Sequence, residues 1–359
     1  MRRLMINFSA LACTLWLVSG SVAAQESSTR FEGRVDVSEV LLDVVVLDRD
    51  GNLVVGLDTS DFVIEAGGRK VEPTSVDFYT THYVDGGALT PANQIPGSRY
   101  FILFFHDQLR NAGEASQLLQ QQVLAGRRSR DWLEEEMGPS DWVAVVGYDV
   151  KLKIHQDFTQ DRGRLLTAVD EAVRGVDPER DGRYRSEASH LDASLLRRLP
   201  SGIDLRRKTT RIYDAMRLVA EASGHIVGRK NLLLYSIGFG DISRDGIARP
   251  DRRYYPDLEQ ALNANNVAVY PLDLTPRNAD HLQSSFLNKI ADDSGGAYYQ
   301  FFTDYRTPLR RIASEATGYY LLSFEAEHPT GESGYRKVKV KTTDKQFTAR
   351  AQKGYRYGD

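Results

Sequence analysis

The chain has 359 residues, 41% of them hydrophobic and 26% charged, which is enough for two globular domains with ample cores. A net charge of −3 gives no reason to expect nucleic acid as a partner. Cys13 is the only cysteine, so the chain beyond the first 24 residues has no disulfide, thiolate zinc site or cysteine nucleophile.

The N-terminus has the pattern of a secretory signal peptide. Arg2 and Arg3 precede an apolar run from Leu11 to Val18, and small residues follow up to Ala24. The alternative is a membrane anchor, but the run is shorter than the roughly 18 apolar residues that a spanning helix needs. We therefore expect residues 1–24 to be removed and the protein to be secreted or periplasmic, with no membrane span after cleavage.

Residues 25–85 read as short strands separated by turns. Valine and leucine dominate from Val40 to Leu47, and an Asp-Gly-Asn turn at 50–52 supplies the positive φ that hairpins need. This pattern predicts an N-terminal β segment. Residues 86–98, with several glycines and two prolines, are predicted to be a linker.

The stretch from Arg99 to Asn111, RYFILFFHDQLRN, predicts the central strand of a second type of fold. Its apolar run from Tyr100 to Phe105 is too short for a typical helix and does not alternate, which is typical of a parallel strand buried on both faces. His106 and Asp107 follow at its carboxyl end, where open α/β sheets bind ligands.

Downstream of this strand, apolar runs alternate with helical patterns as far as residue 318. The sequence predicts an α/β domain over 99–318 with a doubly wound, mostly parallel sheet of six strands. The predicted helices are 114–137, 162–173, 210–223, 255–264, 281–293 and 308–316. The predicted strands after the first are 142–148, an edge strand at 151–158, 231–237, 267–272 and 297–302.

An arginine-rich insertion at 175–208 interrupts this alternation. Because it joins two helices, we expect it to lie at the carboxyl edge of the sheet, beside Asp107. Arginine forks suit carboxylates, so Arg197, Arg198, Arg206 and Arg207 are candidates for binding an acidic protein or glycan surface. The alternative is an ordinary solvated loop, since acidic residues are interspersed.

Residues 319–359 return to a β pattern. Neither this segment nor the N-terminal one is large enough to bury a good core alone. We therefore expect the two to pair into one β-sandwich, with the α/β domain inserted between them.

The α/β region resembles a von Willebrand factor type A domain. The motifs are the first strand ending at Asp107, TRIYDAM from Thr210, GRKNLLLYSIGFGD from Gly228, VAVYPLD from Val267 and ADDSGGAYY from Ala291. The flanking β segments are similar to those of secreted acidobacterial proteins related to this family. The resemblance implies a non-enzymatic adhesion or protein-binding module with an unknown protein or cell-surface ligand.

The resemblance also implies a metal-ion-dependent adhesion site that holds Mg²⁺ through oxygen ligands. Asp107 and Thr210 match two of its five positions, and Asn111 offers a carbonyl oxygen at a third. Leu109 and Ile237 occupy the other two and cannot ligate. The site is therefore predicted to be degenerate, and the alternative is that Asp107 hydrogen-bonds its loop while Thr210 caps a helix.

Two other functions stay open at this point. One is a structural cell-envelope scaffold that docks through the β-sandwich. The other is a hydrolase, which is disfavoured because no Gly-x-Ser-x-Gly elbow, His-Glu-x-x-His zinc motif or phosphate loop is present.

Overall fold

The computed structural model describes residues 35–80, 98–107, 115–178, 193–244, 248–277, 283–302 and 304–358. The predicted signal peptide lies outside these residues, as do most of the linker, Asn111 and the middle of the arginine-rich insertion. Within the described part, no helix is long and apolar enough to cross a membrane.

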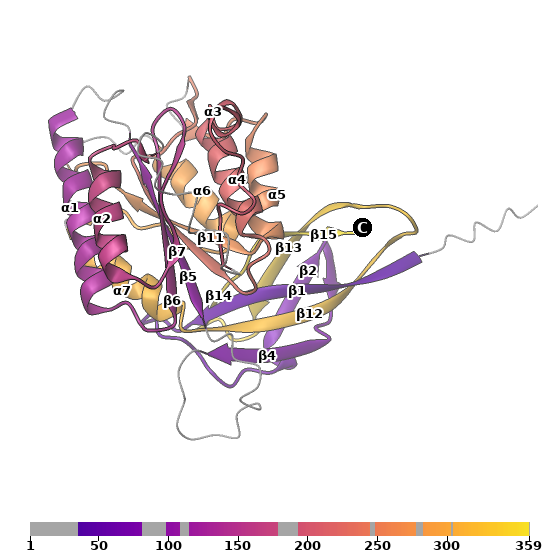
Figure 1. The fold of residues 1–359 in the computed structure, drawn as a ribbon. Coiled ribbons are helices and arrows are strands. Elements are labelled where there is room, and N and C mark those ends of the chain that lie inside the picture. The colour runs from indigo at the N-terminus through magenta and orange to yellow at the C-terminus, as the bar shows by residue number, and fades with distance from the viewer. Residues whose placement is uncertain are drawn as a thin grey trace, which may run out of the picture. The chain divides into compact units, whose positions relative to one another are not determined.

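A five-stranded sheet of order β11-β8-β5-β6-β7 forms the centre of the α/β domain (Figure 1). The strands are β5 (Arg99–His106), β6 (Asp141–Tyr148), β7 (Leu152–Thr159), β8 (Lys230–Ser236) and β11 (Val267–Asp273). All are parallel except β7, which runs antiparallel to β6 at one edge. The predicted central position of β5 is confirmed, and its side chains from Phe101 to Phe105 are almost fully buried.

In place of the predicted sixth strand, the structure has a single isolated β-bridge. Tyr299 forms an isolated parallel bridge with Leu272, in which the Tyr299 amide donates to the Pro271 carbonyl at 2.9 Å. Two residues later Phe301 has a φ of 62°, a left-handed conformation that turns the chain away from the sheet. The ladder therefore cannot continue, and the six-stranded prediction is corrected to five strands.

Helices cover both faces of this sheet (Figure 1). Helices α1, α2 and α7 share one apolar cluster with it, and α4, α5 and α6 share the other, together with a residue of the short α3. These arrangements explain why the strands are apolar on both sides. The bounds are α1 (Ala115–Glu135), α2 (Arg162–Val173), α3 (Ile203–Lys208), α4 (Ile212–Ser223), α5 (Tyr255–Ala264), α6 (Ser284–Ser294) and α7 (Arg306–Glu315).

Two further four-stranded sheets bring the N- and C-terminal segments together. One has the order β14-β1-β12-β4 and the other β15-β13-β2-β3. Strand β1 pairs with β12 over ten residues, and β2 pairs with β13. The bounds are β1 (Val35–Leu47), β2 (Phe62–Ala66), β3 (Arg69–Val71), β4 (Ser75–Thr80), β12 (Gly318–Pro329), β13 (Gly334–Thr342), β14 (Thr348–Arg350) and β15 (Gly354–Tyr357).

Side chains from both of these sheets form a single hydrophobic cluster. Leu42 and Phe324 come from one sheet and Ile64 and Val340 from the other. Each segment alone supplies too little apolar surface for a core, so the pairing of two segments far apart in sequence makes this core possible.

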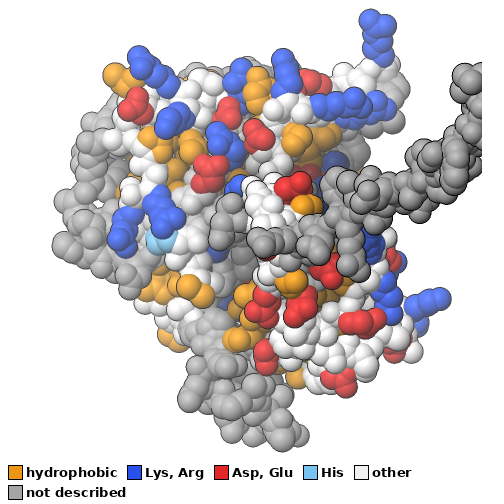
Figure 2. Space-filling model, turned by 90° about the vertical axis from the view of Figure 1, so that its right-hand side faces the viewer, with side chains coloured by type: hydrophobic (Ala, Val, Ile, Leu, Met, Phe, Trp, Pro, Cys, Tyr) orange, Lys and Arg blue, Asp and Glu red, His pale blue; other side chains and the backbone are white. Residues whose placement is uncertain are grey.

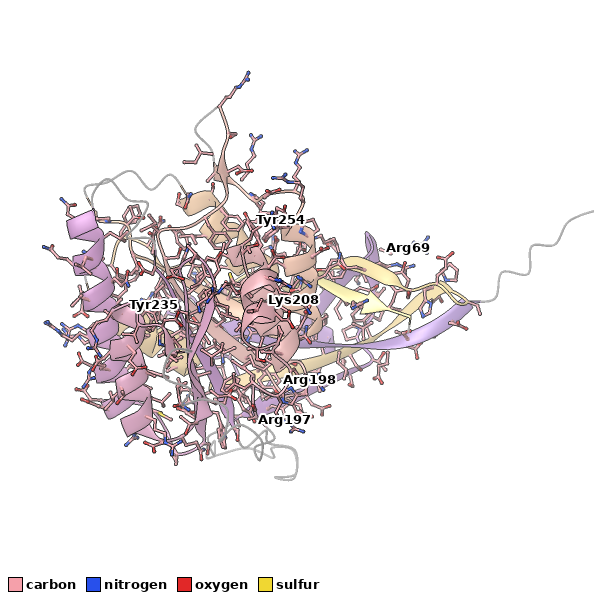
Figure 3. The ribbon with its side chains drawn as sticks, turned by 45° about the horizontal axis from the view of Figure 1, so that its top comes forward. Arg69, Arg197, Arg198, Lys208, Tyr235 and Tyr254 are labelled. Atoms are coloured by element: carbon pink, nitrogen blue, oxygen red, sulfur yellow. The ribbon has the colours of Figure 1, made fainter. Side chains whose placement is uncertain are left out.

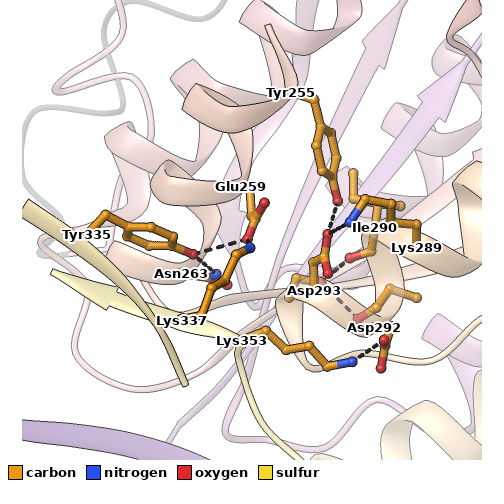
Figure 4. Close-up of polar contacts among 12 residues, drawn as sticks. Tyr255, Glu259, Asn263, Lys289, Ile290, Asp292, Asp293, Tyr335, Lys337 and Lys353 are labelled. Atoms are coloured by element: carbon orange, nitrogen blue, oxygen red, sulfur yellow. Dashed lines mark hydrogen bonds and ion pairs between the residues drawn. The ribbon is translucent and has the colours of Figure 1, made fainter. Parts of the chain in front are cut away.

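Val35–Asp359 forms one compact unit, so the β sheets and the α/β domain are joined by direct contacts. Figure 4 shows some of these contacts. The Lys353 amide of the C-terminal segment donates to the Asp293 carbonyl on α6 at 3.0 Å. Within the α/β domain, the Tyr255 hydroxyl and the Lys289 ammonium bind the Asp293 carboxylate, each at 2.6 Å. Asn263 on α5 donates to the Tyr335 hydroxyl at 2.6 Å. The junction between the two parts is thus polar and hydrogen-bonded.

Candidate functional site at the carboxyl edge of the sheet

The strand order reverses between β5 and β8. From β5 the chain proceeds outward to β6 and β7, and it then returns to the other side of β5 to form β8 and β11. In open α/β sheets, ligands bind in the crevice outside the carboxyl ends of the strands at such a switch point. His106 and Asp107 end β5 there, and Ser236 and Ile237 end β8.

His106 and Ser236 join the two strands across the switch point. The His106 Nδ1 and the Ser236 Oγ lie 2.8 Å apart, and the Gly238 amide donates to the same hydroxyl oxygen at 2.8 Å. Both side chains are buried. Burial lowers the pKa of His106 to about 3, so the imidazole is neutral near pH 7. This buried pair joins the ends of β5 and β8 and forms the floor of the edge.

Two aromatic rings pack next to the buried His106. Tyr148 at the end of β6 lies 5.7 Å from it between ring centroids, and Phe239 lies at 5.9 Å. Phe239 in turn packs edge-on against Tyr213 of α4 and Phe286 of α6. This aromatic layer separates the histidine from solvent and explains its low pKa.

Asp107 lies beside the loop that follows α2. Its amide donates to the Tyr148 carbonyl at 2.8 Å, which ties the end of β5 to β6. A Cβ atom at Gly175 would lie 3.1 Å from the Asp107 Oδ2, and Gly175 has a φ of 68°. The glycine thus permits both the turn and the close approach of the chain to this carboxylate.

Tyr148 also connects this edge to Thr210. Its hydroxyl donates to the Thr210 carbonyl at 3.0 Å. The alternative role of Thr210 as a helix cap is wrong, because α4 begins at Ile212 with Arg211 at the N-cap position and no side-chain cap. The neighbouring Thr209 carries the local structure instead, since its buried hydroxyl accepts from the Leu152 amide at 3.1 Å.

Two buried lysines at the same edge were not predicted. Lys151 pairs with Asp177 and Lys153 with Asp149, each at 3.0 Å, and the Lys153 ammonium also donates to the Gly175 carbonyl at 3.0 Å. A signal was present in the sequence. Lysines two residues apart on a strand project to one face, so they need acidic partners if that face is covered.

The four candidate arginines are exposed, but the structure separates them into two pairs. Arg197 and Arg198 follow Leu195, whose amide donates to Asp157 near the end of β7, which lies toward the amino edge of the parallel strands. Arg206 and Arg207 lie on α3, which leads into Thr209 at the opposite end of β7. Figure 3 shows Arg197 and Arg198 apart from Lys208 of α3. Of the two pairs, only Arg206 and Arg207 lie on an element that leads to the edge that holds Asp107.

The described residues do not fit a complete magnesium site. Asp107 is the one carboxylate at the matching positions, and Ile237 packs against the apolar cluster beneath the sheet. The Ser236 hydroxyl is engaged by His106 and Gly238. Among the residues that the structure describes, no group of three His, Cys, Asp or Glu side chains is placed to hold a metal ion. Asn111 lies outside them.

Comparison with known proteins gives structural neighbours only. No protein-family model matches the sequence, and no curated protein matches it either. Solved structures similar to the chain include von Willebrand factor type A proteins.

One is a von Willebrand factor type A protein from Catenulispora acidiphila, with 11% identity and a TM-score of 0.39, covering 90% of this chain and 73% of that one. The conserved hypothetical protein BatB from Bacteroides thetaiotaomicron has 14% identity and a TM-score of 0.38, covering 61% and 97%. The SpRpn10 VWA domain has 10% identity and a TM-score of 0.31, covering 59% and 94%.

Proposed function

We propose that the chain is a secreted, non-enzymatic, adhesion-type binding module whose ligand surface is the carboxyl edge of the central sheet. The observation that carries the proposal is the switch point between β5 and β8, with Asp107 at its rim and the His106–Ser236 pair as its floor. The sequence motifs shared with von Willebrand factor type A domains support the same edge.

A non-enzymatic role is supported by the state of the groups that could do chemistry. A serine nucleophile needs an accessible hydroxyl and a histidine that can take up its proton. Ser236 is fully buried, and a histidine with a pKa of about 3 is a very weak base at neutral pH. The pair therefore supports a structural role at the edge rather than hydrolysis.

The partner is proposed to be a protein or cell-surface ligand with acidic groups. Arg206 and Arg207 are exposed on α3 and lead into the Thr209–Thr210 turn, so they flank the proposed surface. Secretion is proposed from the N-terminal pattern at 1–24. The paired β sheets are proposed to act as one sandwich that carries the α/β domain.

Metal dependence is proposed to be absent or weak, since Asp107, Asn111 and Thr210 would be the only ligands and one carboxylate rarely holds a hard cation in water. Titration of the full mature chain with Mg²⁺ and with Mn²⁺ by calorimetry tests this. We expect no binding heat and no change in melting temperature. Binding that Asp107→Ala abolishes would instead assign an adhesion site that works with a reduced ligand set.

The ligand surface is tested by capturing exported proteins on the immobilised chain, with and without EDTA. We expect Arg206→Glu/Arg207→Glu to lose the captured partner and EDTA to have little effect. Arg197→Glu/Arg198→Glu is the matched control, because it makes the same charge change toward the other edge of the sheet. Equal loss from both variants, or from neither, would contradict the carboxyl-edge assignment. A partner retained by the β sheets without residues 99–318 would favour the scaffold function.

A further inference from the structure

Over its second half, strand β13 has one edge that pairs with no strand among the described residues; we call it the free edge. Strand β15 pairs with Gly334 to Lys337 of β13 and stops there, whereas β2 pairs with the other side from Val338 to Thr342. The Lys337 carbonyl accepts from Gly67 and the Thr343 amide donates to Asp61, both toward β2. Backbone groups alternate sides along an antiparallel strand, so those of Val340 and Thr342 point away from β2.

Backbone contacts with the end of α6 hold the segment just before β15 away from this edge. The Val338 amide still donates to the Lys353 carbonyl at 3.0 Å, but the Lys353 amide donates to the Asp293 carbonyl at the end of α6. Before Lys353, the backbone of Ala351 packs against Gly295, where a Cβ would lie 2.7 Å from the Ala351 carbonyl carbon. Residues 348–350 then pair with β1 in the other sheet. Within the described residues, no strand takes their place beside Val340 and Thr342.

A cleft of about 770 Å³ lies along this edge. Strand β13, strand β14 and the residues after α6 line it, and Phe347 and Ala349 contribute apolar surface next to the core of the two β sheets. The cleft is thus bounded by an unpaired strand edge on one side and by apolar side chains at its base.

The charged side chains around the cleft are mostly positive. Five of them are Lys or Arg and one, Asp292, is acidic. Lys353 pairs with Asp292 (Figure 4), Arg350 pairs with Glu315 and Lys341 pairs with Glu65. Lys339 and Lys345 are exposed and form no ion pair with any residue that the structure describes. They leave a surplus positive charge at the mouth of the cleft.

The two segments that build the β sheets differ in net charge, and the surplus positive charge lies in the C-terminal one. Residues 318–358 contain eight Lys or Arg and four Asp or Glu, a net charge of 8 − 4 = +4. Residues 35–80 contain three and ten, a net charge of 3 − 10 = −7. Figure 2 shows acidic side chains gathered over the lower part of the face that it draws. The basic cleft is therefore a local feature of a β region that is otherwise acidic.

We propose that this cleft binds an extended acidic segment of a partner protein, which adds as a strand to the free edge of β13. Main-chain hydrogen bonds to Val340 and Thr342 supply affinity, as in other complexes where a peptide extends a sheet. Side chains alternate along a strand, so one face of the segment meets Lys339 and the other faces the apolar base. The cleft therefore selects alternating acidic and apolar residues. This surface is separate from the carboxyl edge proposed above.

The test uses the full mature chain and a fluorescein-labelled peptide of about eight alternating Glu and Val residues, a typical strand length. Anisotropy measures its affinity. We expect saturable binding, and we expect Lys339→Glu/Lys345→Glu to weaken it by at least about tenfold, a loss of about 1.4 kcal/mol. Arg69→Glu/Lys70→Glu is the matched control, because it makes the same charge change on β3 at the opposite edge of the same sheet. It should leave the affinity unchanged.

Two further measurements test strand addition itself. The same peptide with N-methyl groups on alternate amides keeps its charge but loses strand donors, so it should bind at least about tenfold more weakly. Hydrogen exchange should show protection of the Val340 and Thr342 amides when the unmodified peptide is bound. This readout depends on no variant of the protein.

Three results would overturn the proposal. The first is no binding of the unmodified peptide, which would leave the lysines as ordinary protection of a strand edge against aggregation. The second is equal binding of the N-methylated peptide, which would reduce the effect to charge attraction. The third is a concentration-dependent dimer that the peptide does not dissociate, which would assign the edge to a second copy of the chain.

Discussion

The two ends of the central sheet handle their polar groups differently. At the amino edge, Arg99 at the start of β5 binds Asp141 at the start of β6 through two hydrogen bonds of 2.6 Å. The Gly138 amide also donates to Asp141, and Arg99 donates to the Ala313 carbonyl. At the carboxyl edge, the floor is made of the neutral His106 and Ser236, with Asp107 beyond them.

The difference lies in the groups that join neighbouring strands: an ion pair joins β5 to β6 at the amino edge, and a neutral pair joins β5 to β8 at the carboxyl edge. The Arg99–Asp141 pair is almost fully buried and directs its charges at each other and at the backbone. Its geometry satisfies both partners internally, which is the condition under which buried charges are tolerated. The carboxyl edge also pairs charges internally, as Lys151 does with Asp177 and Lys153 with Asp149, but the half-buried Asp107 lies beyond the neutral His106–Ser236 pair. Three changes test this contrast.

The largest effect is expected from Arg99→Ala. Removing the arginine leaves the Asp141 carboxylate buried without its charged partner, which typically costs about 3 to 5 kcal/mol of unfolding free energy. Urea unfolding of the full chain measures the loss. Arg253→Ala is the control, because Arg253 makes a similar fork with Asp251 at the surface, and it should change stability little. Equal losses would remove the contrast between the buried and exposed pairs.

The next effect, smaller for each pH unit than the loss from Arg99→Ala, is expected from acid. Burial lowers the pKa of His106 to about 3 and that of His155 to about 4, whereas both take up protons near pH 6.5 when unfolded. The unfolded chain therefore binds more protons between these values, and stability should fall as the pH drops from 6.5 toward 4. Each histidine adds a slope of about 1.4 kcal/mol per pH unit.

The contribution of His106 to the pH dependence of stability is measured by unfolding the wild type and His106→Gln across this pH range. In this variant, the number of protons taken up on unfolding, given by the slope of unfolding free energy against pH, should be lower by about one. His106→Gln/His155→Gln should lose a second one. A variant whose pH dependence matches that of the wild type would show that His106 is not held neutral at the carboxyl edge.

The smallest effect is expected from Tyr148→Phe. It removes the hydroxyl that donates to the Thr210 carbonyl, while the ring beside His106 stays in place. The loss should be about 1 kcal/mol, the net value of a typical hydrogen bond. Thermal unfolding measures it. Tyr254→Phe is the control, since it keeps the ring that Arg211 and Arg253 contact. A loss as large as that from Arg99→Ala would place a stabilising centre at the carboxyl edge.

Local patterns in the sequence predicted most of the α/β elements. Helices α2 and α5 begin and end at the predicted residues, and β5 is the predicted central strand. These predictions work because apolar periodicity and chain breakers act within one element. The sequence also placed Asp107 at the carboxyl end of the central strand, which locates the candidate edge.

Local sequence patterns could not predict the contacts between residues far apart in the chain. The Arg99–Asp141 pair spans 42 positions and the His106–Ser236 hydrogen bond spans 130, and neither leaves a periodic signal. Local patterns also could not predict that Arg197 and Arg206 belong to segments at opposite ends of β7. Nor could they predict the left-handed turn at Phe301 that ends the sheet.

The sequence by itself determined the type of most major elements and the position of the central strand, because these depend on neighbouring residues. Only the tertiary structure decided which charges are paired, that the histidine is neutral and that no described strand pairs with one edge of β13. Those properties depend on burial and on which segments meet, and the chain sets them only when it folds.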